Sequence, residues 1–431
     1  MTDFLWQKNP ATIDSKIMAF MAGQDVILDR QLFVYDLKAS AAHVKGLASI
    51  GILDTDEADS LLTAMTALER EFLAGDFVLD ERFEDGHSAI ESYLTKQLGE
   101  LGKRVHTGRS RNDQVLVATR LLLRDKLELL QARCSETATL CIARAQRTAD
   151  MPMPGYTHLQ RAVVSSVGLW FAALAESFID NAFLARDTRS WIDANPLGTA
   201  AGFGVNLPLD RRLTTRELGF SRIQVNPIYA QNSRGKFEIQ VLGAFAQALL
   251  DVRRLAWDLS LYSTAEFNFI RLPDRFTTGS SIMPNKRNPD LVELLRAAYP
   301  CVQAAILELQ SLLSLPSGYQ RDLQNTKPPL LRGLQTGCAV MDILPDLLAS
   351  LEFNEQALGG AMEPAMHATD RAMELAAEGV PFRDAYRTVM NDMAELATRE
   401  PLQSVHARVS PGGCANLMLE ELSRRLEQLR Q

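Results

Sequence analysis

The chain has 431 residues, a hydrophobic content of 46% and a formal net charge of −8 at pH 7. A chain of this length buries a large core, which we expect to be divided among roughly two to four units. The acidic balance argues against a nucleic-acid-binding surface, because phosphate binding needs an excess of Lys and Arg. No signal-peptide pattern and no apolar run of about 18 residues is visible, so a cytoplasmic protein that does not span a membrane is predicted. Five scattered cysteines and six histidines without metal-ligand spacing predict neither disulfides nor a metal site.

A capping signal opens the first clear helix. Asp54 is suited to cap it, and Glu57 completes a capping box three residues later. Apolar residues then recur at helical spacing along one face, namely Ala58, Leu61, Leu62, Met65, Leu68 and Phe72. Gly75 is expected to end this helix. A second amphipathic helix is predicted over 88–101, with Gly102 as its stop.

The middle of the chain predicts unusually long helices. Residues 109–150 contain neither glycine nor proline, so a single helix of about 60 Å is expected. Similar stretches occupy 160–194, 229–270, 290–314 and 328–357. Parts of these helices, such as LVATRLLL and LGAFAQALLDV, are apolar on more than one face and must be covered by neighbouring protein. We expect both the same chain and partner subunits to cover them, in an obligate oligomer built on a long bundle.

Polar, glycine-containing breaks divide this pattern into three parts. The breaks near 103–109 and 355–364 predict an N-terminal helical domain over 1–108, a central long-helix bundle over 109–357 that carries most of the site, and a small C-terminal helical domain over 358–431. The fold class is therefore predicted to be all-α. The chain contains no GxGxxG or GxxxxGK[ST] run, so no nucleotide or flavin is expected.

A polar cluster over 106–114 precedes the longest helix. The start of a helix exposes unpaired N–H groups and the positive end of the dipole, which suits a carboxylate ligand. Ser110, Arg111 and Asn112 are placed there to contact such a ligand. The alternative is that Ser110 or Asn112 serves only as the helix N-cap.

Two further polar clusters also lie next to long helices. In residues 153–160 a Pro-Gly turn is followed by Thr157 and His158, and His158 is a candidate acid or base. Residues 279–293 combine Ser280, Lys286 and other polar groups, which can present a small hydroxyl, a cation and an amide to an anion.

The three clusters, in this order, resemble the separate active-site segments of the fumarate-forming lyases. Their argininosuccinate lyase branch is the most similar, because residues 84–88, 315–328, 368–370, 379–383 and 412–413 also match its pattern. The resemblance covers nearly the whole chain. It implies an all-helical fold and a homotetramer in which three subunits contribute to each site. It also implies cleavage of argininosuccinate to arginine and fumarate, the last step of arginine biosynthesis, without metal, nucleotide or flavin.

The resemblance also implies roles for individual residues. Ser280 would be the base, activated by Lys286, while His158 would be the acid, oriented by Glu293. Ser110, Asn112 and Thr157 would bind the succinyl carboxylates, and Asn288 would help to stabilise the carbanion. The residues that would contact the amino-acid end of the substrate are Tyr319, Gln324 and Lys327. His87 and Arg111 are site candidates for which a structural role is the alternative.

The sequence departs from the family pattern at four places. Val163-Val164 follows Arg161-Ala162 in place of Gln-Pro, and residues 233–237 read Ser-Arg-Gly-Lys-Phe in place of Ser-Asp-Arg-Asp-Phe. Gly86 replaces a β-branched residue, and Tyr386 replaces a histidine. These departures leave open another fumarate-forming C–N lyase with a different amine. A non-catalytic structural protein on the same fold is the alternative from another class.

Overall fold

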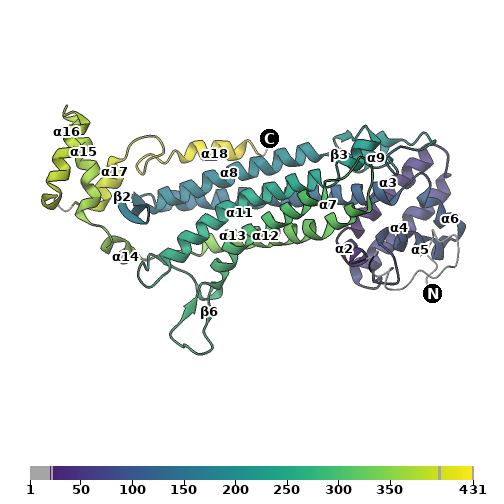
Figure 1. Cartoon of the computed structure of the whole chain (residues 1–431), viewed down its shortest axis with the longest axis horizontal. Helices are drawn as coiled ribbons and strands as arrows, with labels where there is room; N and C mark the ends of the chain where they lie inside the picture. The colour runs from purple at the N-terminus through teal and green to yellow at the C-terminus, as the bar shows by residue number, and fades with distance from the viewer. Residues whose placement is uncertain (1–19, 21–22, 397–398, 430–431) are drawn as a thin grey trace. The chain divides into compact units, whose positions relative to one another are not determined.

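The computed structural model describes residues 20, 23–396 and 399–429, which are predominantly helical (Figure 1), so the predicted all-α class is confirmed. The chain forms two compact units. The first contains residues 1–128, 187–244 and 302–335, and the second contains 129–186, 245–301 and 336–431. This division differs from the predicted boundaries at 108/109 and 357/358, which stay a prediction.

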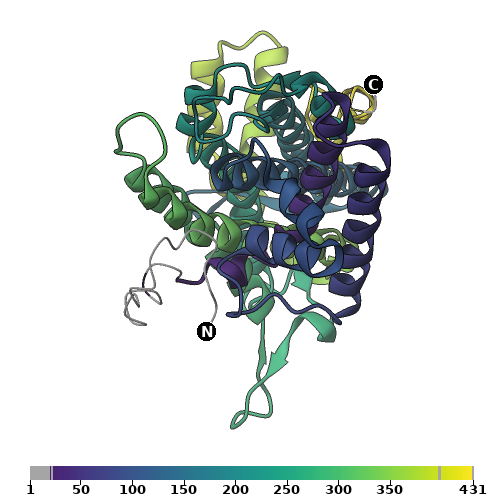
Figure 2. The same cartoon turned by 90° about the vertical axis from the view of Figure 1, so that its right-hand side faces the viewer.

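The N-terminal helices of the first unit lie close together (Figure 2), and their buried side chains form one apolar core. They are α2 (Asp25–Asp29), α3 (Phe33–Ser49), α4 (Thr55–Ala74), α5 (Gly86–Leu98), α6 (Glu100–Lys103) and the 3-10 turn η1 (Arg104–His106). The predicted capping box of α4 is confirmed, because Asp54 accepts the Glu57 N–H and Glu57 accepts the Asp54 N–H. Gly75 ends the helix in the left-handed conformation. The apolar face of α4 is buried in the core.

The predicted end of the second helix was wrong. Helix α5 stops at Leu98, because Gly99 has a φ of +61° and turns the chain into α6. Gly102 lies inside α6, where a side-chain Cβ would come within 2.4 Å of the Leu94 backbone. Gly102 therefore allows two helices to approach closely and does not act as a stop.

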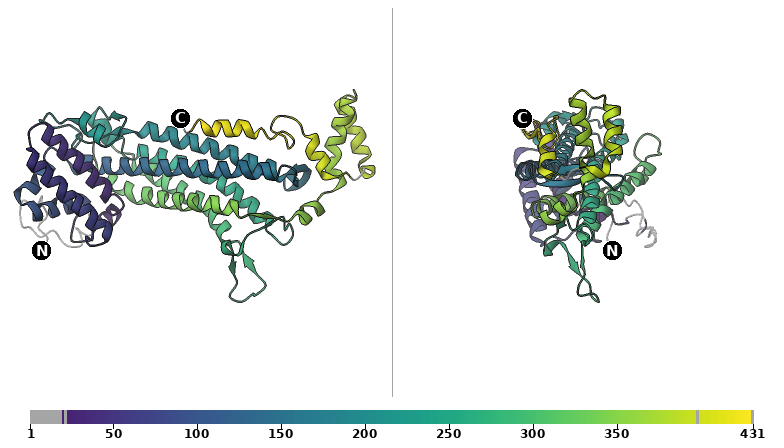
Figure 3. Two further views of the ribbon diagram at one scale, coloured as in Figure 1. Left: turned by 180° about the vertical axis from the view of Figure 1, so that it is seen from behind. Right: turned by 90° about the vertical axis from the view of Figure 1, so that its left-hand side faces the viewer.

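Five long helices run through the middle of the chain (Figures 1 and 3). They are α7 (Arg111–Arg147), α8 (Val167–Ile192), α11 (Lys236–Tyr262), α12 (Asp290–Leu312) and α13 (Lys327–Ala349). Three predicted stretches were too long, and one of them is 328–357, because α13 ends at Ala349 and residues 352–353 form a strand. Residues 160–166 form a strand before α8, and the stretch 229–270 is interrupted by Gly235, whose φ is +84°. Pro300 and Pro345 lie within α12 and α13.

The remaining elements of the first unit are short. They are the two-stranded parallel sheet of β3 (Ala194–Asn195) and β4 (Arg222–Ile223), helices α9 (Arg211–Glu217) and α10 (Pro227–Asn232), and the 3-10 turn η3 (Arg321–Thr326).

The second unit carries three antiparallel strand pairs that the sequence pattern did not indicate. They are β1 (Pro152–Thr157) with β2 (Gln160–Ser166), β5 (Ile270–Arg271) with β8 (Glu352–Phe353), and β6 (Thr278–Gly279) with β7 (Arg287–Asn288). Its other elements are η2 (Asp274–Phe276), α14 (Glu355–Gly360), η4 (Pro364–His367), α15 (Ala368–Ala377), α16 (Phe382–Asn391), η5 (Met393–Glu395), α17 (Pro401–Ala407) and α18 (Leu419–Glu427). In Figure 3, α15 and α16 lie side by side.

The apolar stretches of the long helices differ in how they are covered. Residues 116–123 of α7 are buried by the chain itself. On α12, by contrast, Leu294 and Leu307 are 68% and 64% exposed, and Ala297, Cys301 and Ala304 on the same face are also exposed. Helix α8 is long and apolar enough to cross a membrane, but half of its most apolar window is buried, as in a core helix of a globular protein.

Candidate active site

A cavity of about 190 Å³ in the first unit brings together five of the predicted substrate-binding residues. They are Arg111, Asn112, Tyr319, Gln324 and Lys327. Arg111 and Asn112 come from the start of α7. Tyr319 precedes η3, Gln324 lies within η3, and Lys327 is the first residue of α13. The cavity is also lined by Asp25 and Arg234, which the sequence analysis had not selected as site residues.

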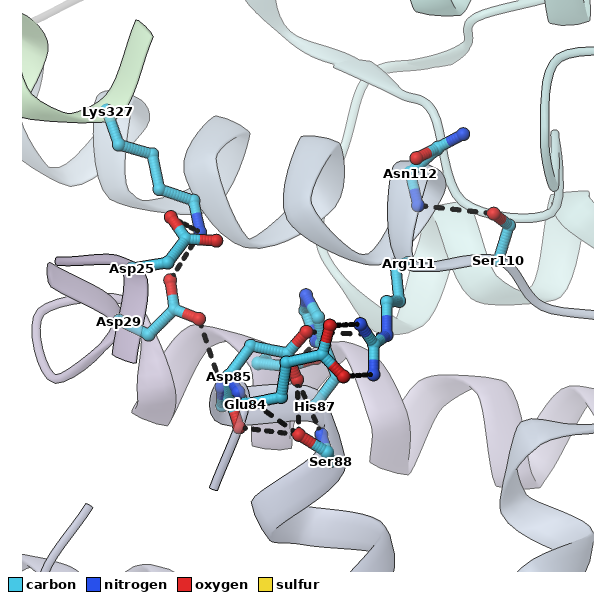
Figure 4. A network of polar contacts seen from close by, with 12 residues as sticks. Asp25, Asp29, Glu84, Asp85, His87, Ser88, Ser110, Arg111, Asn112 and Lys327 are labelled. Carbon is cyan, nitrogen blue, oxygen red and sulfur yellow. Dashed lines mark hydrogen bonds and ion pairs between the residues drawn. The ribbon is translucent and has the colours of Figure 1, made fainter. Parts of the chain in front are cut away.

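Lys327 is held by two carboxylates. Its Nζ atom lies 2.6 Å from Asp29 Oδ1 and 3.0 Å from Asp25 Oδ1 (Figure 4), and the residue is buried. Burial by itself lowers the pKa of Lys327, but the carboxylates of Asp29 and Asp25 outweigh that effect and raise it. Lys327 is therefore a charged group whose positive charge is already matched inside the cavity.

Arg111 is likewise paired. Its Nη1 atom lies 2.6 Å from Glu84 Oε1 and its Nη2 atom donates to Glu84 Oε2 at 2.8 Å, while Nε lies 3.4 Å from Asp85 Oδ2 (Figure 4). Asp85 also caps α5 together with Ser88. The two-pronged contact fixes the plane of the guanidinium, so Arg111 connects the start of α7 to the turn before α5. This geometry agrees with the structural alternative for Arg111.

His87 is buried and follows Glu84 and Asp85, two residues that line the cavity. Its Nδ1 atom forms an ion pair with Asp36 Oδ2, and its Nε2 atom has no hydrogen-bond partner among the described residues. Burial lowers the pKa of His87, but the carboxylates of Asp36, Asp85 and Asp29 outweigh burial and raise the pKa. His87 therefore supports the 84–88 turn from inside, and this placement also agrees with a structural role.

Ser110 and Asn112 lie at the first turn of α7. The Ser110 hydroxyl accepts the Asn112 N–H at 3.3 Å, as expected for an N-cap, whereas the Asn112 side chain lines the cavity. Asp113, which the sequence analysis did not select, organises this turn. Its Oδ1 atom accepts the Ser110 N–H at 3.0 Å, and its Oδ2 atom accepts the N–H groups of Gly198 and Ala200 at 3.0 and 2.9 Å.

Thr157 and His158 lie at the tip of the β1–β2 hairpin in the second unit. Thr157 pairs with Gln160, so His158 and Leu159 form a two-residue turn, with φ values of +55° and +58°. Both angles fall in the left-handed region that such turns require and that glycine or asparagine normally occupies. Strain of this kind in residues other than glycine is frequent at functional sites, and here it holds His158 out into solvent.

Ser280, Lys286 and Asn288 belong to the β6–β7 hairpin, which stands clear of the neighbouring helices (Figure 1). The Ser280 Oγ atom accepts the N–H groups of Ile282 and Met283 at 3.3 and 3.1 Å. Two N–H donors directed at one oxygen stabilise negative charge on it, which is what a serine needs to act as a base. Lys286 is exposed, and Glu293 is exposed in the first turn of α12.

Charged residues that were not predicted from the sequence line the cavity or pair with a residue that lines it. Glu84 and Asp85 were recognised as part of a motif without a role, and Arg234 only as a departure from the family pattern. Asp25 and Asp29 carried no signal, because their partner Lys327 lies about 300 residues away in the chain, 298 residues after Asp29. Among the described residues no group of three or more His, Cys, Asp or Glu side chains is arranged to hold a metal ion.

Sequence comparison identifies the family. A family model described as "Lyase" matches residues 13–303. The chain is 56% identical to the argininosuccinate lyase of Stenotrophomonas maltophilia (strain R551-3) over 430 residues, with 100% of both chains covered. It is also 56% identical over 431 residues to that of Xanthomonas campestris pv. campestris (strain B100), again with 100% of both covered. This chain belongs to the argininosuccinate lyase family. The predicted resemblance is confirmed, and the chain is a lyase.

Solved structures share the fold at lower identity. EDDS lyase in complex with formate superposes with a TM-score of 0.81 at 23% identity, over 96% of this chain and 90% of that one. Recombinant class II fumarase from Schistosoma mansoni gives a TM-score of 0.69 at 17% identity, over 90% of this chain and 94% of the other. At these identities the likeness supports the helical fold and nothing about the substrate.

Proposed function

We propose that this protein cleaves argininosuccinate into arginine and fumarate by acid–base elimination across a C–N bond. The observation that carries the proposal is the full-length match to argininosuccinate lyases of more than half identity. The reaction is the last step of arginine biosynthesis, and we propose that it takes place in the cytoplasm.

The chemistry requires a base for a carbon-bound proton. A proton next to a carboxylate is a very weak acid, and its removal produces a dianionic aci-carboxylate that needs fixed positive groups around it. In the proposed mechanism the Ser280 oxygen takes this proton, supported by the N–H groups of Ile282 and Met283. Lys286 and Asn288 on the same hairpin stabilise the carbanion.

The leaving nitrogen requires a proton from an acid. His158 supplies it in this proposal, directly or through a water molecule, and Glu293 orients the imidazole and favours its charged form. Thr157, Ser110 and Asn112 bind the succinyl carboxylates. Tyr319, Gln324 and Lys327 form the part of the cavity that takes the amino-acid end of the substrate.

A homotetramer with sites shared between subunits completes the proposal. In the single chain Thr157, His158, Lys286 and Glu293 are all exposed to solvent. The proposed chemistry needs a dry site, because water weakens the electrostatic stabilisation of the carbanion. Other copies of the chain, packed against the exposed apolar face of α12, would cover these residues.

A fumarate-release assay tests the function. The purified protein is incubated with argininosuccinate, adenylosuccinate, aspartate or malate, and fumarate is followed by its ultraviolet absorbance. Release from argininosuccinate alone is expected. Release only from another substrate would replace the proposed amine, and no release from any of the four would favour a structural protein on this fold.

A further inference from the structure

Arg234 is a buried cation in the cavity without a carboxylate partner at ion-pair distance. The residue is 5% exposed and lines the cavity together with Asp25, Tyr319, Gln324 and Lys327. Its Nε atom donates to Thr326 Oγ1 at 3.3 Å, and neither Nη atom has a hydrogen-bond partner in the described part of the chain. A buried guanidinium is costly unless it is paired, so a ligand that supplies negative charge is expected.

The other buried or half-buried cations of the cavity are already matched. Lys327 is held between Asp25 and Asp29, and Arg111 is held by Glu84 and Asp85. No carboxylate among the described residues lies within 4.0 Å of the Arg234 guanidinium. The carboxylates of Asp25 and Glu238 therefore interact with it electrostatically only at a longer distance. Among the buried and half-buried cations of the cavity, Arg234 is therefore the one best able to form a new two-pronged contact with an anion.

The backbone around Arg234 is fixed. Ser233 accepts a hydrogen bond from Gln224 Nε2 at 2.8 Å, and Gly235 donates its N–H to Glu238 Oε2 at 2.6 Å. The left-handed backbone of Gly235 separates α10 from α11 and leaves Arg234 in the short turn between them. This turn lies within the 233–237 stretch in which the sequence departs from the family pattern, so the departure places a guanidinium in the cavity.

We propose that Arg234 binds the α-carboxylate of the amine half of the substrate and so selects an amino acid over the corresponding decarboxylated amine. The inference rests on the proposed function and adds a residue that determines specificity. A planar guanidinium presents two parallel N–H groups to a carboxylate, which an ammonium group cannot do. Arg234 contacts the end of the substrate remote from the reacting carbon, so its loss is expected to act mainly on binding.

Calorimetric titration with arginine and with agmatine, which lacks the carboxylate, tests the inference. The intact protein is expected to bind arginine about 10- to 100-fold more tightly than agmatine, as for a charge-assisted contact. Arg234→Met should bring this ratio close to one by weakening arginine binding, and Arg234→Lys should give an intermediate ratio. For argininosuccinate, Arg234→Met should raise KM and leave kcat within about three-fold.

Arg222→Met is the matched control. Arg222 is an exposed arginine of the same unit that donates to the Trp191 carbonyl at 2.9 Å, and it does not line the cavity. Its replacement should leave the arginine-to-agmatine ratio unchanged. Thermal unfolding shows whether each variant is folded, and if Arg234→Met does not fold, Arg234→Lys carries the test.

Two results would overturn the inference. The first is equal affinity of the parent protein for arginine and agmatine. The second is an unchanged arginine-to-agmatine affinity ratio in a folded Arg234 variant, which would show that Arg234 does not contact the carboxylate of the ligand. Failure of the proposed function is a separate result, namely the absence of fumarate release from argininosuccinate by the parent protein.

Discussion

Charge pairing inside the first unit distinguishes the cations that already have carboxylate partners from Arg234, which has none at ion-pair distance. Lys327 and Arg111 each contact two carboxylates and so connect distant segments of the chain. His87 in α5 likewise connects two distant segments, because it forms an ion pair with Asp36 in α3. Removing one member of the buried Lys327–Asp29 or His87–Asp36 pair leaves the other unpaired and costs about 3–5 kcal/mol, more than a surface ion pair contributes.

His87 should make stability depend on pH in a defined direction. Its folded pKa is raised above the ordinary value of about 6.5, so the protonated form is favoured by folding. The stabilisation is fully present below about pH 6.5 and is lost as the pH rises through the raised folded pKa. Thermal unfolding of the parent and of His87→Gln should therefore differ most at low pH and converge at high pH.

A second histidine provides the control for that measurement. His406 forms an exposed ion pair with Asp150 at 2.9 Å, with 57% of its side chain accessible. Exposed pairs contribute about 0–1 kcal/mol, so His406→Gln should follow the parent closely at every pH. Parallel unfolding profiles for the parent and His87→Gln would contradict the stabilising role of the buried pair.

Ser280 carries the strongest prediction for turnover. Ser280→Ala should lower kcat by about 10²- to 10⁴-fold, the usual contribution of a positioned base, while the molecular mass in solution stays that of the parent protein. Ser281→Ala changes the neighbouring exposed hydroxyl and should retain most of the activity. Fumarate release and light scattering measure the two effects, and turnover of Ser280→Ala near the parent rate would remove Ser280 from the mechanism.

Short turns with left-handed backbone set the positions of elements that carry candidate site residues. The turn at His158 and Leu159 reverses β1 into β2, and Gly235 separates α10 from α11. In a residue with a Cβ atom this backbone conformation costs about 1–2 kcal/mol, so the surrounding structure must maintain it. His158 adopts this conformation at the tip of a hairpin in spite of its Cβ atom, whereas glycine at position 235 has no Cβ atom and adopts it without the same free-energy cost.

Gly235→Ala should destabilise the protein. Besides its positive φ, the new Cβ would lie 2.5 Å from Leu313 Cδ2 and would force that side chain to move. A loss of about 1–2 kcal/mol is expected, seen as a lower thermal midpoint.

Gly359→Ala is the matched control. Gly359 is an exposed helical residue of α14 with no atom within 4 Å of an added Cβ, so alanine should stabilise it by up to about 1 kcal/mol. A shift of the same sign in both variants would show that backbone conformation is not the deciding factor.

At the scale of the whole molecule, the exposed apolar face of α12 is the feature on which the proposed assembly depends. The face of α12 that contains Leu294, Ala297, Cys301, Ala304 and Leu307 repeats at three- and four-residue spacing and is exposed in the single chain. A contiguous exposed apolar face is a feature of protein–protein interfaces. The proposed tetramer would bury it.

Leu307→Glu should disrupt this assembly. A carboxylate buried in an apolar interface is unfavourable, so light scattering at micromolar concentration should show smaller species, and fumarate release should fall with them. Leu73→Glu in α4 changes a leucine of similar exposure, 69% against 64% for Leu307, and should leave mass and activity unchanged. A Leu307→Glu variant with parent mass and activity would exclude this face from the assembly.

Local signals predicted much of the fold. The cap at Asp54, the apolar spacing of α4 and the long glycine- and proline-free stretch of α7 depend on residues close in sequence, so they could be read directly. The β1–β2 and β6–β7 hairpins were missed, because their strands are short and lack β-branched alternation. Five predicted binding residues do line one cavity, but Asp25 and Arg234 could not be assigned to it from spacing alone.

The order of residues along the chain is enough to establish the helical class, the caps and the three polar segments, since each depends on neighbours within a few positions. The partners of the charged groups depend instead on how distant segments pack. Lys327 is neutralised by Asp25 and Asp29 from the other end of the chain, while Arg234 is left without a carboxylate at contact distance. Which cation in the cavity is left without a carboxylate partner is therefore decided by folding, because Coulomb energy depends on distance in space and not on separation in sequence.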